Sequence, residues 1–135
     1  MKKYRLLLWL LIVALVINIS GCASKIPENV TETTYREGKK ALAIMDDYLS
    51  GKIDVNTLSD SLWPISEAVG AEYDRLNNIP NDPKSDKFDL NLLFTSSNTN
   101  NVSLSISSFV LGAMGERGYD CESVRNDLYN ILNPD

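Results

Sequence analysis

The fold class of this chain depends on residues 88–113, FDLNLLFTSSNTNNVSLSISSFVLGA, because two periodicities compete there. Helical spacing of three and four connects Phe88, Leu92, Thr95, Thr99, Val102, Ile106, Phe109 and Ala113. The alternative is a hairpin that sets Phe88, Leu90 and Leu92 against Val102, Leu104 and Ile106, since the second trio alternates as in a strand. The polar SSNTNN in the middle is poor helix material, but it contains no glycine for a tight turn. The pattern therefore favours one long or interrupted helix.

Two amphipathic helices are predicted before this stretch. The first has the stripe Tyr35, Gly38, Leu42, Met45 and Leu49. Thr34 and Glu37 are expected to form its capping box, and Gly51 to end it. The second opens near Asp54 and has the stripe Val55, Leu58, Leu62, Ile65, Val69, Tyr73 and Leu76. It contains Pro64, which predicts a kink or a brief break because proline removes one backbone hydrogen bond.

Turn-forming residues separate these two helices from the rest of the chain. Residues 77–86, NNIPNDPKSD, contain two prolines and predict the main loop. A short last helix follows Gly118, with Asp120 as its cap and Cys121, Val124, Leu128 and Ile131 on its apolar stripe. Cys121 is expected to pack in the core as a small hydrophobe. Residues 31–135 thus predict an all-α domain, a small bundle of three to four helices.

The amino-terminal segment has a different composition. Lys2, Lys3 and Arg5 precede an apolar run over 6–17, and the small residues Ser20 and Gly21 follow it. This order is typical of a secretory signal. The run is shorter than the about 20 residues that span a membrane, so a permanent anchor helix would have to extend through residues 18–22.

Residues 19–22, ISGC, resemble the lipobox of bacterial lipoprotein precursors, with isoleucine where leucine is usual. The resemblance implies a signal peptide over 1–21, cleavage between Gly21 and Cys22, and a lipidated Cys22 that opens a tether over 22–30. It implies a palmitate-type acyl anchor in the bacterial cell membrane, with the protein facing outside the cytoplasm. Two acyl chains are enough for stable attachment. An ordinary cleaved signal, or a short anchor with an incidental cysteine, is the alternative. The domain itself resembles, without a discrete motif, small uncharacterised helical lipoproteins of low-GC Gram-positive bacteria.

Charge and composition narrow the function classes. Removal of residues 1–21 leaves 10 of the 13 basic residues against 18 acidic ones, a net charge of −8. An acidic domain disfavours nucleic acid as a partner, because nucleic-acid binding depends on clustered lysine and arginine. The chain has no histidine, the usual general base and the commonest zinc ligand. We therefore expect no enzyme activity, no catalytic residues, no metal site and no cofactor.

The favoured hypothesis is a non-catalytic, lipid-anchored helical module of the cell envelope. It would bind an envelope protein or another envelope component. Trp63 and Tyr48 fall off the apolar stripes, so they are the predicted recognition patch. The alternatives are a carrier of a small ligand or metal, and an enzyme that uses carboxylates alone.

Overall fold

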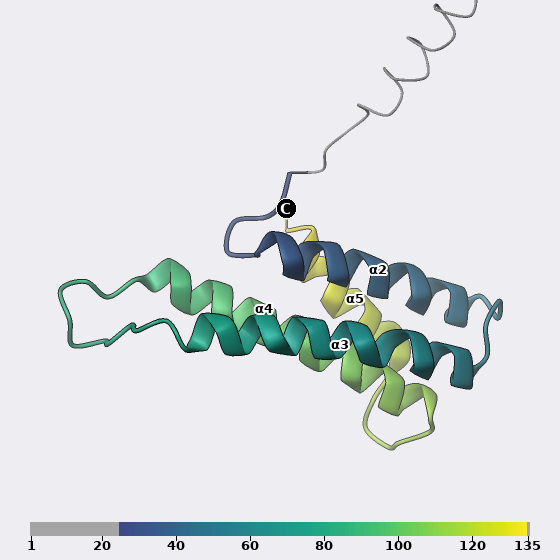
Figure 1. Ribbon diagram of the computed structural model, residues 1–135. Coiled ribbons are helices and arrows are strands. Elements are labelled where there is room, and N and C mark those ends of the chain that lie inside the picture. Colours follow the sequence, from purple (N-terminus) through teal and green to yellow (C-terminus); the bar gives the residue numbers. More distant parts are fainter. Residues whose placement is uncertain (1–24, 135) are drawn as a thin grey trace, which may run out of the picture.

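The computed structural model describes residues 25–134, which form four helices and contain no strand (Figure 1). The helices are α2 (Glu32–Leu49), α3 (Val55–Asn77), α4 (Leu90–Ala113) and α5 (Cys121–Leu132). The prediction of a small all-α bundle is confirmed. The segment that resembles a lipobox lies outside the described residues.

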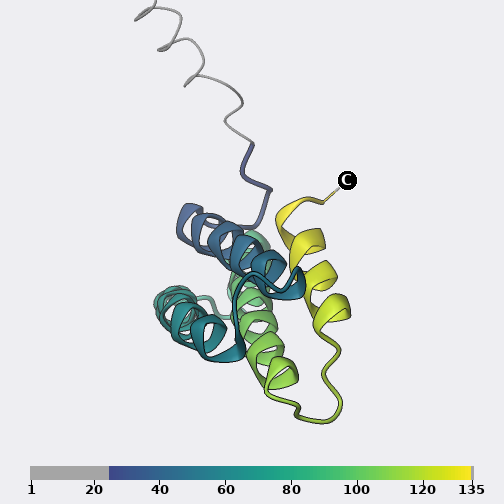
Figure 2. The ribbon, with the colours of Figure 1, turned by 90° about the vertical axis from the view of Figure 1, so that its right-hand side faces the viewer.

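Consecutive helices run in opposite directions around one core (Figure 1). Seen close to end-on in Figure 2, α4 lies between α3 and α5, and α2 covers these helices from one side. The longer α3 and α4 project past α2 at the end where residues 78–89 connect them (Figure 1). The core is formed mainly by one stripe from each helix, and its largest fully buried side chain is Phe109 of α4.

The stretch for which a helix and a hairpin were the alternatives forms one 24-residue helix, α4. The carboxylate of Asp89 caps it by accepting hydrogen bonds from the backbone N–H groups of Asn91 and Leu92, at 2.9 and 3.2 Å. Its predicted stripe is buried at Thr99, Val102, Ile106 and Phe109. Ser96 and Val110 are also buried, and the prediction did not include them.

Hydroxyl groups explain how the polar middle of α4 enters a helical core. Thr99 bonds Thr34 of α2 across the interface, with 3.1 Å between their hydroxyl oxygens. Farther along α4, the hydroxyls of Ser107 and Ser66 of α3 lie 2.9 Å apart. Because these polar groups find partners when buried, they cost far less than unpaired hydroxyls would. Packing against α2 and α3 therefore holds these residues of weak helix propensity in a helix.

The capping box predicted from Thr34 and Glu37 is wrong, because α2 begins earlier. Thr31 is the cap, and its hydroxyl oxygen accepts from the Thr34 backbone N–H at 3.1 Å. Thr34 is instead fully buried beside Thr99. The predicted end of the helix is confirmed at Gly51, whose φ of +75° is a left-handed conformation that suits glycine.

A kink or a brief break was predicted at Pro64, and the break is absent, because α3 continues through this residue. Pro64 cannot donate to the carbonyl of Asp60, yet both residues are exposed, so water can reach that carbonyl. The predicted cap of α3 is confirmed. The Asp54 carboxylate accepts from the Thr57 backbone N–H at 2.8 Å.

The last helix agrees with its predicted cap and stripe, and one further residue of it is buried. The Asp120 carboxylate accepts from the backbone N–H of Ser123 at 2.9 Å. Leu128 is fully buried, and Leu132 joins it in the core. Cys121, Val124 and Ile131 are partly buried and pack against this core, so the predicted stripe is confirmed, with Cys121 half-buried at the edge of the core.

Candidate functional site

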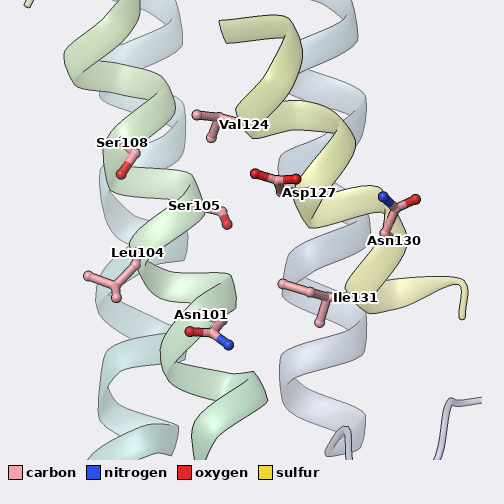
Figure 3. A pocket seen from close by; sticks show the side chains of 8 residues that line it. All are labelled: Asn101, Leu104, Ser105, Ser108, Val124, Asp127, Asn130 and Ile131. Atoms are coloured by element: carbon pink, nitrogen blue, oxygen red, sulfur yellow. The ribbon is translucent and has the colours of Figure 1, made fainter. Parts of the chain in front are cut away.

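A groove of about 420 Å³ lies between α4 and α5 (Figure 3). The α4 side is lined by Asn101, Leu104, Ser105 and Ser108, and the α5 side by Val124, Asp127, Asn130 and Ile131. In Figure 3, Ser105 and Asp127 point into the space between the two helices. The two helices therefore supply one wall each, and both walls mix apolar and polar groups.

The groove has the chemistry of a docking surface. Its amides and hydroxyls can donate and accept hydrogen bonds, while Leu104, Val124 and Ile131 supply apolar contact. Of the described residues that line it, Asp127 is the only one with an ionisable side chain. The two serines therefore have no lining histidine or lysine to activate them as nucleophiles. The arrangement can bind through shape and hydrogen bonds.

The groove adjoins a face of α4 that points away from α2. Leu90, Leu93, Phe94 and Leu104 lie on this side, and they are 51, 49, 48 and 55% exposed. We call them, together with Ser97, Asn101, Ser108 and Leu111 at the same helical phase, the outer face of α4. In Figure 2, the described chain places no helix on the side of α4 opposite α2. This face therefore carries large apolar side chains between small polar ones, and no described helix covers it.

Charge is absent from the whole of α4. Residues 90–113 contain no aspartate, glutamate, lysine or arginine, although such residues make up 23% of the chain. A surface helix without charge is the composition found at the centre of protein–protein interfaces. The sequence contains this sign, but the predicted recognition patch rests on aromatic side chains off the apolar stripes, and so it missed the outer face.

The two residues of the predicted recognition patch differ in their surroundings. Trp63 of α3 is 39% exposed. Tyr48 is half-buried at the end of α2, and its ring packs edge-on against Phe109 at 5.9 Å between centroids. The Tyr48 hydroxyl donates to the carbonyl oxygen of Ala113 at 3.5 Å. Tyr48 therefore serves the core, and Trp63 is the exposed member of the pair.

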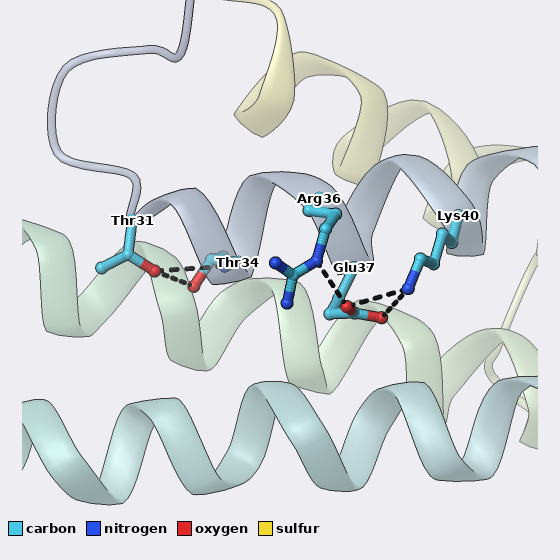
Figure 4. Close-up of polar contacts among 5 residues, drawn as sticks. All are labelled: Thr31, Thr34, Arg36, Glu37 and Lys40. Atoms are coloured by element: carbon cyan, nitrogen blue, oxygen red, sulfur yellow. Dashed lines mark hydrogen bonds and ion pairs between the residues drawn. The ribbon is translucent and has the colours of Figure 1, made fainter.

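Nearly buried carboxylates lie on α2 and α3, and each is paired with cations. Glu37 accepts from Arg36 at 2.9 Å and from Lys40 at 3.0 Å (Figure 4). Hydrogen bonds from these two cations lower the pKa of Glu37. Glu72 accepts from Arg75 at 2.8 Å, and this hydrogen bond lowers the pKa of Glu72. Both groups are thus ionised at neutral pH, whereas a general acid needs a raised pKa.

The free thiol of Cys121 is also unsuited to chemistry. Burial raises its pKa, and the nearby Asp120 carboxylate raises it further. The thiol therefore stays protonated at neutral pH, and the protonated form is a weak nucleophile. Its sulfur lies 3.8 Å from the carbonyl oxygen of Phe109, to which it donates. Within residues 25–134, no three acidic or cysteine side chains are grouped so that they could hold a metal ion.

Comparison with known proteins identifies no relative. No family model, curated protein or solved structure matches this chain significantly. Over the part of the chain that the structure describes, no helix has both the length and the hydropathy needed to cross a membrane.

Proposed function

We propose that this protein is a lipid-anchored, non-catalytic helical module of the bacterial cell envelope that binds a protein partner. The outer face of α4 carries the proposal, because it combines large exposed apolar side chains with a complete lack of charge. Single exposed apolar residues are common on soluble proteins, but a row of them along one helix marks an interaction surface. Trp63 is a single exposed aromatic outside this row and so is the weaker site for this role.

The polar chemistry of the domain supports binding in preference to catalysis. The carboxylates of Glu37 and Glu72 are committed to ion pairs, and Cys121 is kept protonated. The groove beside the outer face offers amides, hydroxyls and apolar side chains. These groups recognise a surface by complementarity, and they leave a bound molecule chemically unchanged.

The location is proposed from the resemblance of residues 19–22 to a lipobox. Lipidation of Cys22 would hold residues 25–134 close to the outer side of the membrane through the short tether. Cys22→Ala should then give a precursor that keeps residues 1–21 and takes up no labelled palmitate, measured by autoradiography and mass spectrometry. Equal labelling of this variant and the wild type would contradict the anchor. Cys121→Ala is the matched control and should label normally.

Recovery of a partner from membranes tests the binding role. A tagged full chain, co-expressed with an untagged copy, is solubilised in a mild detergent and captured, and the proteins that come with it, the untagged copy included, are quantified. We expect a stoichiometric protein partner with the wild type and loss of this partner with Leu104→Glu, since a carboxylate would enter an apolar contact. Recovery that is equal for both forms, or no partner with either, would contradict binding through α4.

A further inference from the structure

We infer that the partner on the outer face of α4 is a second copy of this chain, whose own α4 runs antiparallel to the first across a two-fold axis near Asn101. This inference rests on the proposed function, and it specifies the partner of the same surface. Three features of the chain support it: the order of residues along the face, the charge of the molecule, and the length of α5.

The residues along the face are arranged almost symmetrically about Asn101. Spacings of four and three connect Leu90, Phe94, Ser97, Asn101, Leu104, Ser108 and Leu111, which is the repeat that two packed helices share. In an antiparallel pair centred on Asn101, Leu90 of one copy lies opposite Leu111 of the other, and Ser97 lies opposite Leu104. By the same symmetry, Ser108 lies opposite Phe94. Each of the two serines thus faces a large side chain, as interdigitating side chains require.

Asn101 itself suits the axis of such a pair. A two-fold axis brings each axial residue against its own copy, so the residue there must complement itself. An asparagine side chain has both donors and an acceptor, so two facing amides can hydrogen-bond reciprocally. A buried polar residue of this kind also selects one register, because any sliding of the helices would leave the amides unpaired.

The charge of the protein favours this face for contact between copies. The chain has a net charge of −5, or −8 without residues 1–21, so two copies repel each other at long range. The other helices carry charged side chains at exposed positions, such as Arg36 on α2 and Asp74 on α3. The outer face of α4 is uncharged along its whole length, so two copies can meet there without placing like charges in contact.

The shape of the bundle leaves room for the second helix. The 24 residues of α4 extend for about 36 Å, and the 12 residues of α5 for about half of that length. The end of α5 lies beside the middle of α4, where Ile131 and Asn101 line opposite walls of the groove (Figure 3). The amino-terminal half of α4, with Leu90 and Phe94, extends past α5 and is half-exposed. A second α4 can therefore lie along the groove and over this half.

Disulfide cross-linking of the full chain in bacterial membranes tests the inference. In a Cys121→Ala background, Asn101→Cys places one thiol close to its counterpart across the axis, within reach of a disulfide. Mild oxidation should give a covalent dimer on a non-reducing gel. Asn56→Cys, at an exposed asparagine of α3, is the matched control and should give about tenfold less dimer or lower. The Cys121→Ala background alone should give none.

Two further variants test the orientation and the chemistry. Co-expression of Leu90→Cys chains and Leu111→Cys chains with different tags should give a mixed dimer, and neither chain alone should give one. Leu104→Glu should lower the Asn101→Cys dimer about tenfold or more, since two carboxylates would enter the contact. Leu49→Glu adds the same charge at a residue of α2 that is 40% exposed, and it should leave the dimer unchanged.

The outcomes separate this inference from the proposed function. A dimer at Asn101→Cys no stronger than at Asn56→Cys would overturn the inference. So would a Leu90→Cys chain that cross-links to itself, since that requires parallel helices. Cross-linking of Asn101→Cys to a different protein would overturn the inference that the partner is a second copy, and it would support the proposed function. The fold of Leu104→Glu is checked by comparing its circular dichroism with that of the wild type. A folded Leu104→Glu variant that still dimerises overturns the inference.

Discussion

Replacement of Gly38 by alanine is expected to destabilise the domain, although alanine is the better helix former. Gly38 lies within α2, and a Cβ atom there would meet Leu132 Cδ1 at 2.7 Å, Cδ2 at 3.1 Å and Cγ at 3.4 Å. Leu132 is 1% exposed, so its side chain has little free space around it. The variant therefore tests whether the end of α5 packs directly on the backbone of α2.

Two opposing contributions determine how much Gly38→Ala changes the free energy of unfolding. Alanine in a helix interior is favoured over glycine by about 0.5–1 kcal/mol, since glycine loses more backbone freedom on folding. Overpacking a buried contact costs about 1–3 kcal/mol. Leu132 is the last residue of α5 and can shift more easily than a residue in mid-helix, so the lower part of that range applies. We expect a net loss of about 1 kcal/mol.

Gly70 provides the matched control. It also lies inside a helix, α3, but the only atom that a Cβ there would meet is Ser103 Oγ, at an ordinary distance of 3.8 Å. Gly70→Ala should therefore keep the gain in helix propensity and stabilise the domain by about 0.5–1 kcal/mol. The two substitutions are chemically identical, so the difference of about 1.5–2 kcal/mol between them reports the contact with Leu132.

The unfolding free energies of Gly38→Ala and Gly70→Ala are measured by urea unfolding, followed by circular dichroism at 222 nm, on the chain without residues 1–21. A double variant isolates the contact, since Gly38→Ala should become neutral or stabilising when combined with Leu132→Ala. The reasoning is refuted if Gly38→Ala is as stable as Gly70→Ala. It is refuted equally if the effect of Gly38→Ala is the same with and without the Leu132 side chain.

Three other predictions concern the helices and their buried groups. Ile106→Pro should cost about 3 kcal/mol or more in unfolding free energy, because it removes a backbone hydrogen bond inside α4; a smaller loss, measured by urea unfolding, would contradict a continuous helix. Cys121 should react with a thiol reagent more slowly in the folded domain than in urea, because burial raises its pKa; equal rates would contradict its packing. The pKa values of Glu37 and Glu72 are lowered from 4.5, so the unfolded chain binds more protons in acid, and the stability should fall as the pH drops below about 4.5. A variant with Glu37→Gln and Glu72→Gln should lose less stability between pH 7 and pH 3, and an equal loss would contradict this cause.

Local patterns were sufficient to predict the helical class and most helix ends. The caps at Asp54 and Asp120 and the stop at Gly51 follow from short-range chemistry, since each involves only a few neighbouring residues. The apolar stripes were also predictable, because core-facing positions recur every three or four residues. The prediction that α4 is a helix was correct for this reason, because its helical spacing continues across the polar SSNTNN.

Features that depend on neighbouring helices were not predictable in the same way. Thr31 and Thr34 are equally good caps by residue type, and only the pairing of Thr34 with Thr99 of α4 places Thr34 in the core. The continuity of α3 depends on Pro64 facing solvent, where its missing hydrogen bond costs less. Tyr48 lay off the predicted stripe of α2, yet the position of Phe109 turns it into a core contact.

The proposed binding surface depends partly on the sequence and partly on the tertiary structure, for a physical reason. Its composition is a property of the sequence alone, because residues 90–113 have no charged side chain wherever they lie. Which of these residues are exposed depends on the tertiary structure, since α4 has apolar residues on more than one side. The bundle covers the side with Val102 and Ile106 by packing it against the other helices. It leaves Leu90 and Leu104 half-exposed, because α5 is too short to cover the full length of α4 and no other described helix lies on that side.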